Sequence, residues 1–360
     1  MSEQSTDQNR SHVVLLSIAF AGIFLYGLLA ALPGSVLPTL ERNQFLPNDN
    51  AVGTFLLINA VGAVLAYIVS GPIIDRIGNR FALTLGSGLV IAAMVGFAFT
   101  VIKVQPRSAL SLIFLNSLVL GVGANAIVAA GHALVADIAA SWRNAALNLL
   151  DICFGLGLAS LPLLVQTLQQ RGGLELIFWS LAGLALLILT FVIGSRFPAS
   201  THFESWTIKD AGSLFANPSF ILLALALFMY VGTEVSVGKW VVTFMERDPR
   251  ILMSHGLDAT RVANMSPEGL TRFFETDAAG YAVARYALRT VSFFAFALLV
   301  GRLISSILLG VFRMNSYLLM LAGSLLTTIG LIVSFTANTT GMVRVGLIAA
   351  GLGMGPTFPT

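Results

Sequence analysis

Charged side chains are scarce in this sequence. Only 10% of its 360 residues are Asp, Glu, Lys or Arg, whereas about a quarter is usual in a soluble domain. Hydrophobic residues make up 56% of the chain, and its mean hydropathy is +0.87. A water-facing fold cannot bury so much apolar surface. The composition therefore excludes a soluble globular protein and predicts an all-α, polytopic membrane protein.

Cysteine is almost absent, and the sequence shows no pattern of reactive side chains. Cys153 is the single cysteine, which excludes an intrachain disulfide and a cysteine-based metal cluster. The formal net charge is only +3 and no basic tract is present, so we expect no nucleic-acid partner. There is no nucleophile–base pattern, phosphate-binding loop or metal-ligand spacing. We therefore expect no enzyme, no cofactor and no metal.

Ten apolar runs approach or exceed the roughly 20 residues that a membrane-spanning helix needs. They lie near residues 13–40, 51–74, 81–103, 108–136, 144–168, 174–195, 218–245, 285–310, 314–336 and 341–360. The break at 196–217 separates six spans from four. We therefore expect an amino-terminal six-helix bundle in residues 1–195, a cytoplasmic central linker in 196–217 and a carboxy-terminal bundle in 218–360.

An internal repeat supports this division. The segment V-S-G-P-I-I at 69–74 resembles L-V-G-R-L-I at 299–304, and G-V-G-A-N at 121–125 resembles G-L-G-M-G at 351–355. Both pairs have the same offset of 230 residues (301 − 71 and 351 − 121). The second copy stops in the equivalent of the fourth span, so we expect a full form of twelve spans, of which ten are visible. A natural ten-span protein is the alternative.

A second long polar break, residues 246–284, contains a helix signal. Ser266 is a good amino-terminal cap, Pro267 suits a first helical turn and Glu268 favours the positive end of a helix. The run from there to Arg289 predicts a helix leading into the eighth span. Its role as a lid, a partner surface or a plain solvated excursion stays open.

The segment Gly71–Arg80, G-P-I-I-D-R-I-G-N-R, lies between two spans. Asp75, Arg76 and Arg80 must lie at the water boundary, and Gly78 suits a sharp turn. An ordinary basic turn is the alternative. The pattern resembles the loop G-x-x-x-D-R-x-G-x-R/K that joins helices 2 and 3 in the major facilitator superfamily.

The resemblance implies a fold of two pseudo-symmetric helix bundles in the cell inner membrane, acting as a monomer, with the amino terminus and this loop in the cytoplasm. Charge counting, which agrees only in part, assigns Arg302 to the cytoplasmic boundary. Asp137 and Arg143 flank the next cytoplasmic turn. We expect them to pair with the Asp75 and Arg76 cluster as a gate, which also includes Gly71, Gly78 and Arg80.

Polar residues inside spans are the candidates for a substrate site, because an ionised side chain at the bilayer centre costs about 2.5–3.5 kcal/mol on insertion scales. Asn148 and Asp151, three residues apart, share a face of the fifth span. Carboxylates accept hydrogen bonds from sugar hydroxyls, and a poorly hydrated Asp151 can carry a proton. A structural acid paired with an arginine of a neighbouring helix is the alternative.

The seventh span offers a second acid. Tyr230 and Glu234 are four residues apart on one face, and Trp240 follows. A ring beside a carboxylate is what sugar sites use, although Trp240 also suits an interfacial belt. In the fourth span, Asn125 lies seven residues before His132, which either takes part in transport or bonds to its own helix backbone. Asn59 is a weaker candidate for the cavity.

Two branches of the superfamily differ at marker positions. Drug–proton antiporters place an arginine where this chain has Ser117. The sequence is more similar to the fucose–galactose–proton symporter branch, through A-A-G-H-A-L-V-A-D, L-N-L-L-D…F-G-L-G, Y-V-G-T-E-V-S-V-G and G-P-T-F-P-T. It departs from that branch because the first span has no acid between Val13 and Leu40 and Ile127 falls near the expected acid of the fourth span.

The resemblance therefore implies a lipid-embedded symporter of a small solute such as a sugar. Asp151 and Glu234 are the expected proton carriers, and the substrate contacts are expected at Asn125, Asn148, Asp151, Tyr230, Glu234 and Trp240. An exporter of drugs or metabolites is one alternative. A sensor or interaction protein that uses residues 246–284 is another.

Overall fold

The computed structural model describes residues 3–197 and 217–357. Within these ranges the secondary structure is helical, with no β-strand. What we call the amino-terminal half contains α1 (Glu3–Arg42), α2 (Asp49–Ile77), α3 (Asn79–Lys103), α4 (Pro106–Ile138), η1 (Ala140–Trp142) and α5 (Arg143–Gly194). The carboxy-terminal half contains α7 (Pro218–Arg247), α8 (Pro249–Ser254), α9 (Ala259–Ala263), α10 (Pro267–Thr276), α11 (Ala278–Gly310), α12 (Ser316–Thr336), α13 (Thr340–Met354) and η2 (Gly355–Thr357).

Eight helices in the described ranges are long and apolar enough to cross a bilayer. One of them, α5, is two spans, because the backbone leaves the helical region at Gly172 and Gly173. Gly173 has φ +67°, which glycine adopts without the clash that a Cβ would cause. With α5 counted twice and the shorter apolar α13 added, the expected ten apolar helices are present. The linker expected at 196–217 lies almost entirely outside the described residues, so the domain boundaries stay a prediction.

Polar side chains mark where the helices begin. Asp277 accepts hydrogen bonds from the backbone of α11 at Ala279 N, 2.9 Å away. Ser266 accepts one from Gly269 N at 3.2 Å, which confirms the helix start predicted there. The expected continuous helix to Arg289 was wrong, because α10 ends at Thr276 and Asp277 caps a new helix.

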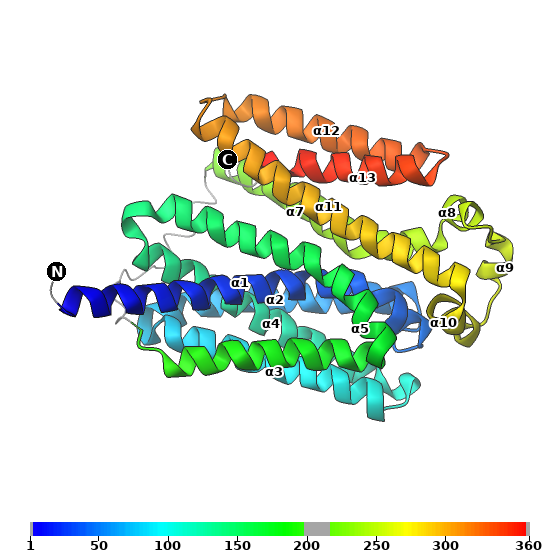
Figure 1. Cartoon of the computed structure of the whole chain (residues 1–360), viewed down its shortest axis with the longest axis horizontal. Coiled ribbons are helices and arrows are strands. Elements are labelled where there is room, and N and C mark those ends of the chain that lie inside the picture. The colour runs from blue at the N-terminus through cyan, green and yellow to red at the C-terminus, as the bar shows by residue number, and fades with distance from the viewer. Residues whose placement is uncertain (1–2, 198–216, 358–360) are drawn as a thin grey trace.

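Figure 1 shows long helices that run side by side along the molecule, with α8, α9 and α10 gathered at the end opposite to the start of α1. In the amino-terminal half α1 packs against α5, α2 against α4, and α3 against α4 and α5. In the carboxy-terminal half α13 packs against α11 and α12. The two halves meet where α5 packs against α11 and α1 against α7.

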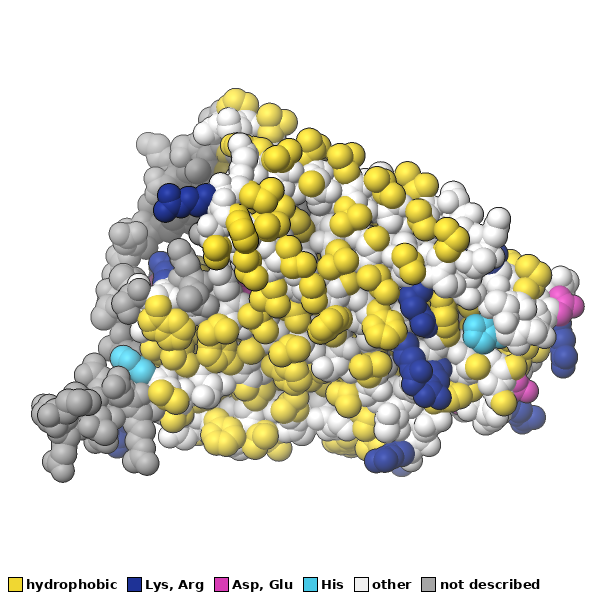
Figure 2. Space-filling model, turned by 45° about the horizontal axis from the view of Figure 1, so that its top comes forward, with side chains coloured by type: hydrophobic (Ala, Val, Ile, Leu, Met, Phe, Trp, Pro, Cys, Tyr) yellow, Lys and Arg dark blue, Asp and Glu magenta, His cyan; other side chains and the backbone are white. Residues whose placement is uncertain are grey.

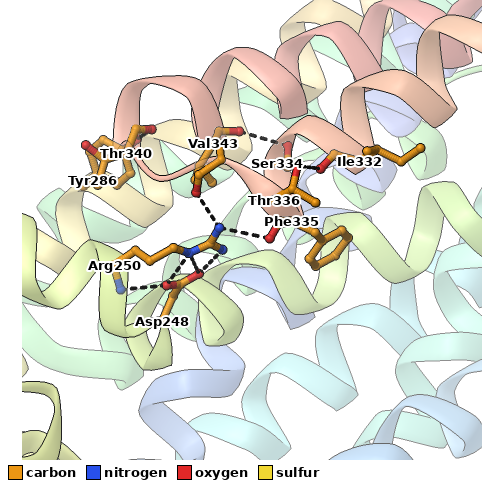
Figure 3. Close-up of polar contacts among 10 residues, drawn as sticks. Asp248, Arg250, Tyr286, Ile332, Ser334, Phe335, Thr336, Thr340 and Val343 are labelled. Carbon is orange, nitrogen blue, oxygen red and sulfur yellow. Dashed lines mark hydrogen bonds and ion pairs between the residues drawn. The ribbon is translucent and has the colours of Figure 1, made fainter.

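A polar clamp fixes α8 to the turn between α12 and α13 (Figure 3). Arg250 donates from Nη1 to the carbonyl oxygens of Phe335 at 3.0 Å and Ala337 at 2.6 Å. Its Nη2 donates to Asp248 Oδ2 at 2.5 Å. The start of the segment between α7 and α11 is therefore attached to the end of α12 and the turn that follows it.

The outer surface is apolar. Leu57, Leu222 and Val345 are each more than 60% exposed, at 64%, 67% and 62%. Figure 2 shows apolar side chains spread across the visible face, with Lys and Arg toward its ends. Leaving such surface in water costs roughly 25 cal/mol per Å², whereas lipid tails cover it without that cost. The protein is therefore a multi-pass membrane protein.

Candidate functional site

Polar and aromatic side chains from both halves meet at the interface between them. Arg302 of α11 donates from Nη2 to Glu234 Oε1 of α7 at 3.3 Å, and the two side chains are only 9% and 15% exposed. The guanidinium group lies over the ring of Phe154 of α5, 5.8 Å from its centroid. Tyr26 of α1 stacks on Phe154 with 5.4 Å between ring centroids. The central cluster, as we call it, consists of Tyr26, Asn125, Asp151, Phe154, Tyr230, Glu234 and Arg302.

Close helix packing brings these rings together. A Cβ on Gly27 of α1 would lie 3.1 Å from Gly157 Cα of α5, and one on Gly157 would lie 3.0 Å from Gly27 Cα. A Cβ on Gly155 would lie 2.8 Å from a methyl group of Leu299 on α11. Small residues let membrane helices approach closely. This packing lets α5 present Phe154 to both α1 and α11.

Asn125 is held inside the amino-terminal half. Its Nδ2 donates to Gly121 O at 2.9 Å, and its Oδ1 accepts from the Tyr26 hydroxyl at 3.3 Å. Asn125 is 7% exposed. Its amide thereby positions the Tyr26 ring against Phe154.

Two carboxylates from opposite halves interact with one guanidinium group. Glu234 forms the ion pair with Arg302, while Asp151 of α5 interacts electrostatically with Arg302 and with His132. Tyr230, one turn before Glu234, interacts electrostatically with both members of the ion pair. Because a buried ion pair has lost much of its hydration, loss of either charge leaves the other uncompensated. The charge of each acid therefore affects the electrostatic balance around Arg302.

The sequence analysis missed three members of the central cluster, namely Tyr26, Phe154 and Arg302, and it had placed Arg302 elsewhere. The assignment of Arg302 to the cytoplasmic boundary was wrong, because the residue is 8% exposed and paired with Glu234. A signal was available in the sequence. An arginine inside the apolar run L-V-G-R-L-I is costly in a bilayer unless a partner compensates its charge.

Other predicted site residues lie apart from the ion pair or have structural bonds. Trp240 follows Glu234 by six residues, about 240° around the helix, and packs against the main hydrophobic core. Asn148 is exposed on α5. His132 Nδ1 lies 2.9 Å from Val128 O of its own helix, and Asn59 Nδ2 donates to Ser117 O at 3.1 Å, which joins α2 to α4. The roles expected for Asn148 and Trp240 stay predictions.

The loop expected to form a gate joins α2 and α3. Gly78 has φ +102°, which explains the glycine in this turn. Asn79 Nδ2 donates to Asp137 Oδ2 at 3.5 Å, and Arg80 Nη2 donates to Ile193 O at 2.6 Å. The ion pairs found in the described part of the chain do not join Asp75 or Arg76 to Asp137 or Arg143. The expected gate pairing stays a prediction.

The relatives and solved structures compared with this chain are distant in sequence. Bypass of stop codon protein 6 of Saccharomyces cerevisiae is 21% identical over 323 residues, which is 78% of this chain and 62% of that protein. The chain spans about three fifths of the length of the curated relatives that it matches. The partially occluded inward open structure of the xylose transporter XylE from E. coli superposes with a TM-score of 0.68 at 14% identity, over 97% of this chain and 85% of that chain. The crystal structure of a variant of the E. coli fucose:proton symporter, FucP, superposes with a TM-score of 0.64 at 14% identity, over 97% and 83%.

The profile that describes the Major Facilitator Superfamily matches residues 19–360. This match covers nearly the whole sequence and agrees with the packing of two helix groups around a polar centre. The chain therefore belongs to the major facilitator superfamily of membrane transporters.

Proposed function

We propose that this protein takes up a small polyhydroxylated solute, such as a sugar, together with protons. The two halves alternate between arrangements that open the central cluster to one side of the membrane or the other. The observation that carries the proposal is the buried Arg302–Glu234 pair beside Asp151 of the opposite half. In this proposal the protein lies in the cell inner membrane with its amino terminus in the cytoplasm.

Proton binding has a direct effect on this cluster. A proton that enters from outside neutralises Glu234, and Arg302 is then attracted to Asp151 across the interface. When the proton leaves toward the cytoplasm, Glu234 recovers its charge and the original pair forms again. The attraction between the halves thus depends on protonation, which couples proton movement to the change of conformation.

The same cluster suits a sugar as substrate. The stacked rings of Tyr26 and Phe154 offer an aromatic surface for the apolar face of a pyranose. The carboxylates of Asp151 and Glu234 accept hydrogen bonds from hydroxyl groups, and Arg302 donates them. Polar groups that are already held in place lose little entropy when the solute binds.

The test is uptake of labelled hexoses and pentoses into proteoliposomes that contain the purified protein. We expect accumulation of at least one sugar when the proton gradient is directed inward and no accumulation without it. Glu234→Gln and Asp151→Asn should each abolish gradient-driven accumulation, while exchange of internal for external sugar can persist. Accumulation that is unchanged in both variants would refute the assignment of these acids.

Export is the competing function. If folded protein takes up none of the sugars, the same vesicles should be loaded with candidate drugs or metabolites and assayed for proton-driven efflux. Efflux without sugar uptake would replace the symport proposal with an export function for the same fold.

A further inference from the structure

A cavity lies between the halves on the side of α8, α9 and α10. It has a volume of about 240 Å³ and is lined by residues of α1, α5, α7, α10 and α11. Its wall residue Ser35 follows Tyr26 by nine residues on α1, which is about 14 Å along the helix. The volume equals the share of about eight water molecules in the liquid. A cavity of this size accepts a small solute rather than a drug-sized one.

Polar side chains from both halves form its walls. Arg42 Nη1 donates to Glu246 Oε2 at 2.5 Å across the interface, and these side chains are 9% and 8% exposed. Gln166 Nε2 donates to the Tyr281 hydroxyl at 2.7 Å, and this bond also joins the halves. Gln169 Nε2 lies 3.0 Å from Thr39 Oγ1. Bonds that connect α1 to α7 and α5 to α11 therefore form part of the cavity wall.

These walls have unused hydrogen-bonding capacity. Arg42 Nε is buried without a hydrogen-bond partner in the structure. Gln166 and Gln169 bond through their amide nitrogens, and in the described ranges nothing donates to their carbonyl oxygens. A buried donor without a partner costs about 1–3 kcal/mol. A ligand with both hydroxyl donors and oxygen acceptors would satisfy all three groups.

The charges around the cavity favour an uncharged ligand. Arg42 and Arg285 line it together with Glu246 and Glu275, so its formal charges cancel. An anion would approach two carboxylates and a cation two guanidinium groups. The ring of Phe274 lies 5.0 Å from the Arg42 guanidinium carbon and adds an apolar surface. These features match a small polyhydroxylated solute.

We propose that this cavity is a separate outer solute site, occupied in transit between the outer side and the central cluster. The inference rests on the proposed function for the substrate class and goes beyond it by placing a second binding position at Arg42, Gln166 and Gln169. The site is lined by the Arg42–Glu246 pair and by α10.

A cysteine protection assay tests the site without relying on transport. Cys153→Ser removes the single native thiol. In that background Ala284→Cys places a reporter in the cavity wall, and Ala263→Cys places a control beside a neighbouring cavity. Both are combined with Asp151→Asn and Glu234→Gln, which remove the two carboxylate acceptors of the central cluster and weaken binding there. The purified proteins are labelled with a small thiol reagent in the presence of D-xylose, L-fucose, D-glucose or no solute.

We expect at least one sugar to slow labelling of the A284C thiol several-fold and to leave that of A263C unchanged. Adding Gln166→Leu and Gln169→Leu should remove the protection. Tritiated sugar binding to the variant without central acids, with and without Gln169→Leu, provides a second measurement that does not depend on reagent access.

The outcomes separate this inference from the proposed function. If a sugar is transported but neither protects A284C nor binds through Gln169, the outer site is refuted while transport stands. If a sugar protects A284C through Gln166 and Gln169 but is not transported, the outer site stands and the transport proposal fails. Protection that persists in both leucine variants also refutes the site.

Discussion

Arg302 is the residue that links the two acids of the central cluster. Its charge is compensated by Glu234 of α7, covered by Phe154 of α5 and within electrostatic reach of Asp151. Removing one partner of a buried pair costs about 3–5 kcal/mol, whereas replacing both is often nearly neutral. The energetic role of Arg302 is therefore to compensate acids that the site requires.

The first prediction concerns this pair. Arg302→Gln should lower the free energy of unfolding by about 3–5 kcal/mol, since Glu234 then stays buried without its partner. The double variant Arg302→Gln with Glu234→Gln should recover most of this loss. Unfolding in detergent, followed for the wild type, both single variants and the double variant, measures the coupling. Additive losses would show that the pair contributes nothing.

The second prediction concerns the contact between α1 and α5. Gly157→Leu should lower the unfolding midpoint, because the new side chain would meet the backbone of α1 at Gly27. Overpacking of this kind costs about 1–3 kcal/mol or more. Gly183→Leu on the same helix is the matched control, since a Cβ at Gly183 meets nothing within 4 Å. Equal midpoints for the two variants would contradict the prediction.

At the scale of elements, α8 is joined to the α12–α13 turn by the clamp of Figure 3. Burial alone would raise the pKa of Asp248, but its hydrogen bonds from Arg250 hold that pKa below the ordinary value of 3.8. The same contacts raise the pKa of Arg250. α8 is therefore expected to move with the carboxy-terminal half.

The third prediction follows from the sign of the Asp248 shift. Because its pKa is lower in the folded protein, the folded state binds this proton less readily than the unfolded state. The stabilisation is fully present above pH 3.8 and is lost as the pH falls through the lower folded value. The difference in unfolding midpoint between wild type and Asp248→Asn should therefore disappear in acid. In an Arg250→Gln background, the effect of Asp248→Asn on the unfolding midpoint should vary little with pH.

At the scale of the whole molecule, the halves are joined on the side of α8, α9 and α10. Arg42 pairs with Glu246 between α1 and α7, and Arg247 pairs with Asp49 at 3.0 Å and with Glu41 at 3.1 Å. By contrast, the beginning of α7 is exposed, with Leu222 at 67%. The structure therefore has the two halves bonded together at one end, and opening that end requires these pairs to separate.

The fourth prediction is that Glu246→Gln favours opening at this end. The buried Arg42 would lose its charged partner, so labelling of the A284C thiol in the Cys153→Ser background should become faster. Exchanging the charges with Arg42→Glu and Glu246→Arg should slow it again. Asp49→Asn is the control, since its side chain is 68% exposed and such surface pairs contribute about 0–1 kcal/mol. Equal labelling rates of A284C with and without Glu246→Gln would contradict the prediction.

Much of the helical architecture could be predicted from local patterns. Hydropathy located the ten apolar helices, and Ser266 marked the start of α10, because both signals depend on neighbouring residues alone. The same reasoning failed at Asp277, where a capping side chain ended the expected continuous helix. It also misplaced Arg302, because the compensating acid Glu234 lies 68 residues away in the chain.

By itself the sequence determined that this protein crosses the membrane as a bundle of helices and that its loop at Gly71–Arg80 belongs to the superfamily pattern. Composition and short motifs suffice for this, since each helix satisfies its own backbone in lipid. Only the tertiary structure decided which polar residues meet. It paired Arg302 with Glu234 and Arg42 with Glu246, and it placed Phe154 between α1 and α11. Contacts between distant helices depend on how their surfaces pack. Glycines such as Gly27 and Gly157 allow a close approach only between helices that already lie side by side.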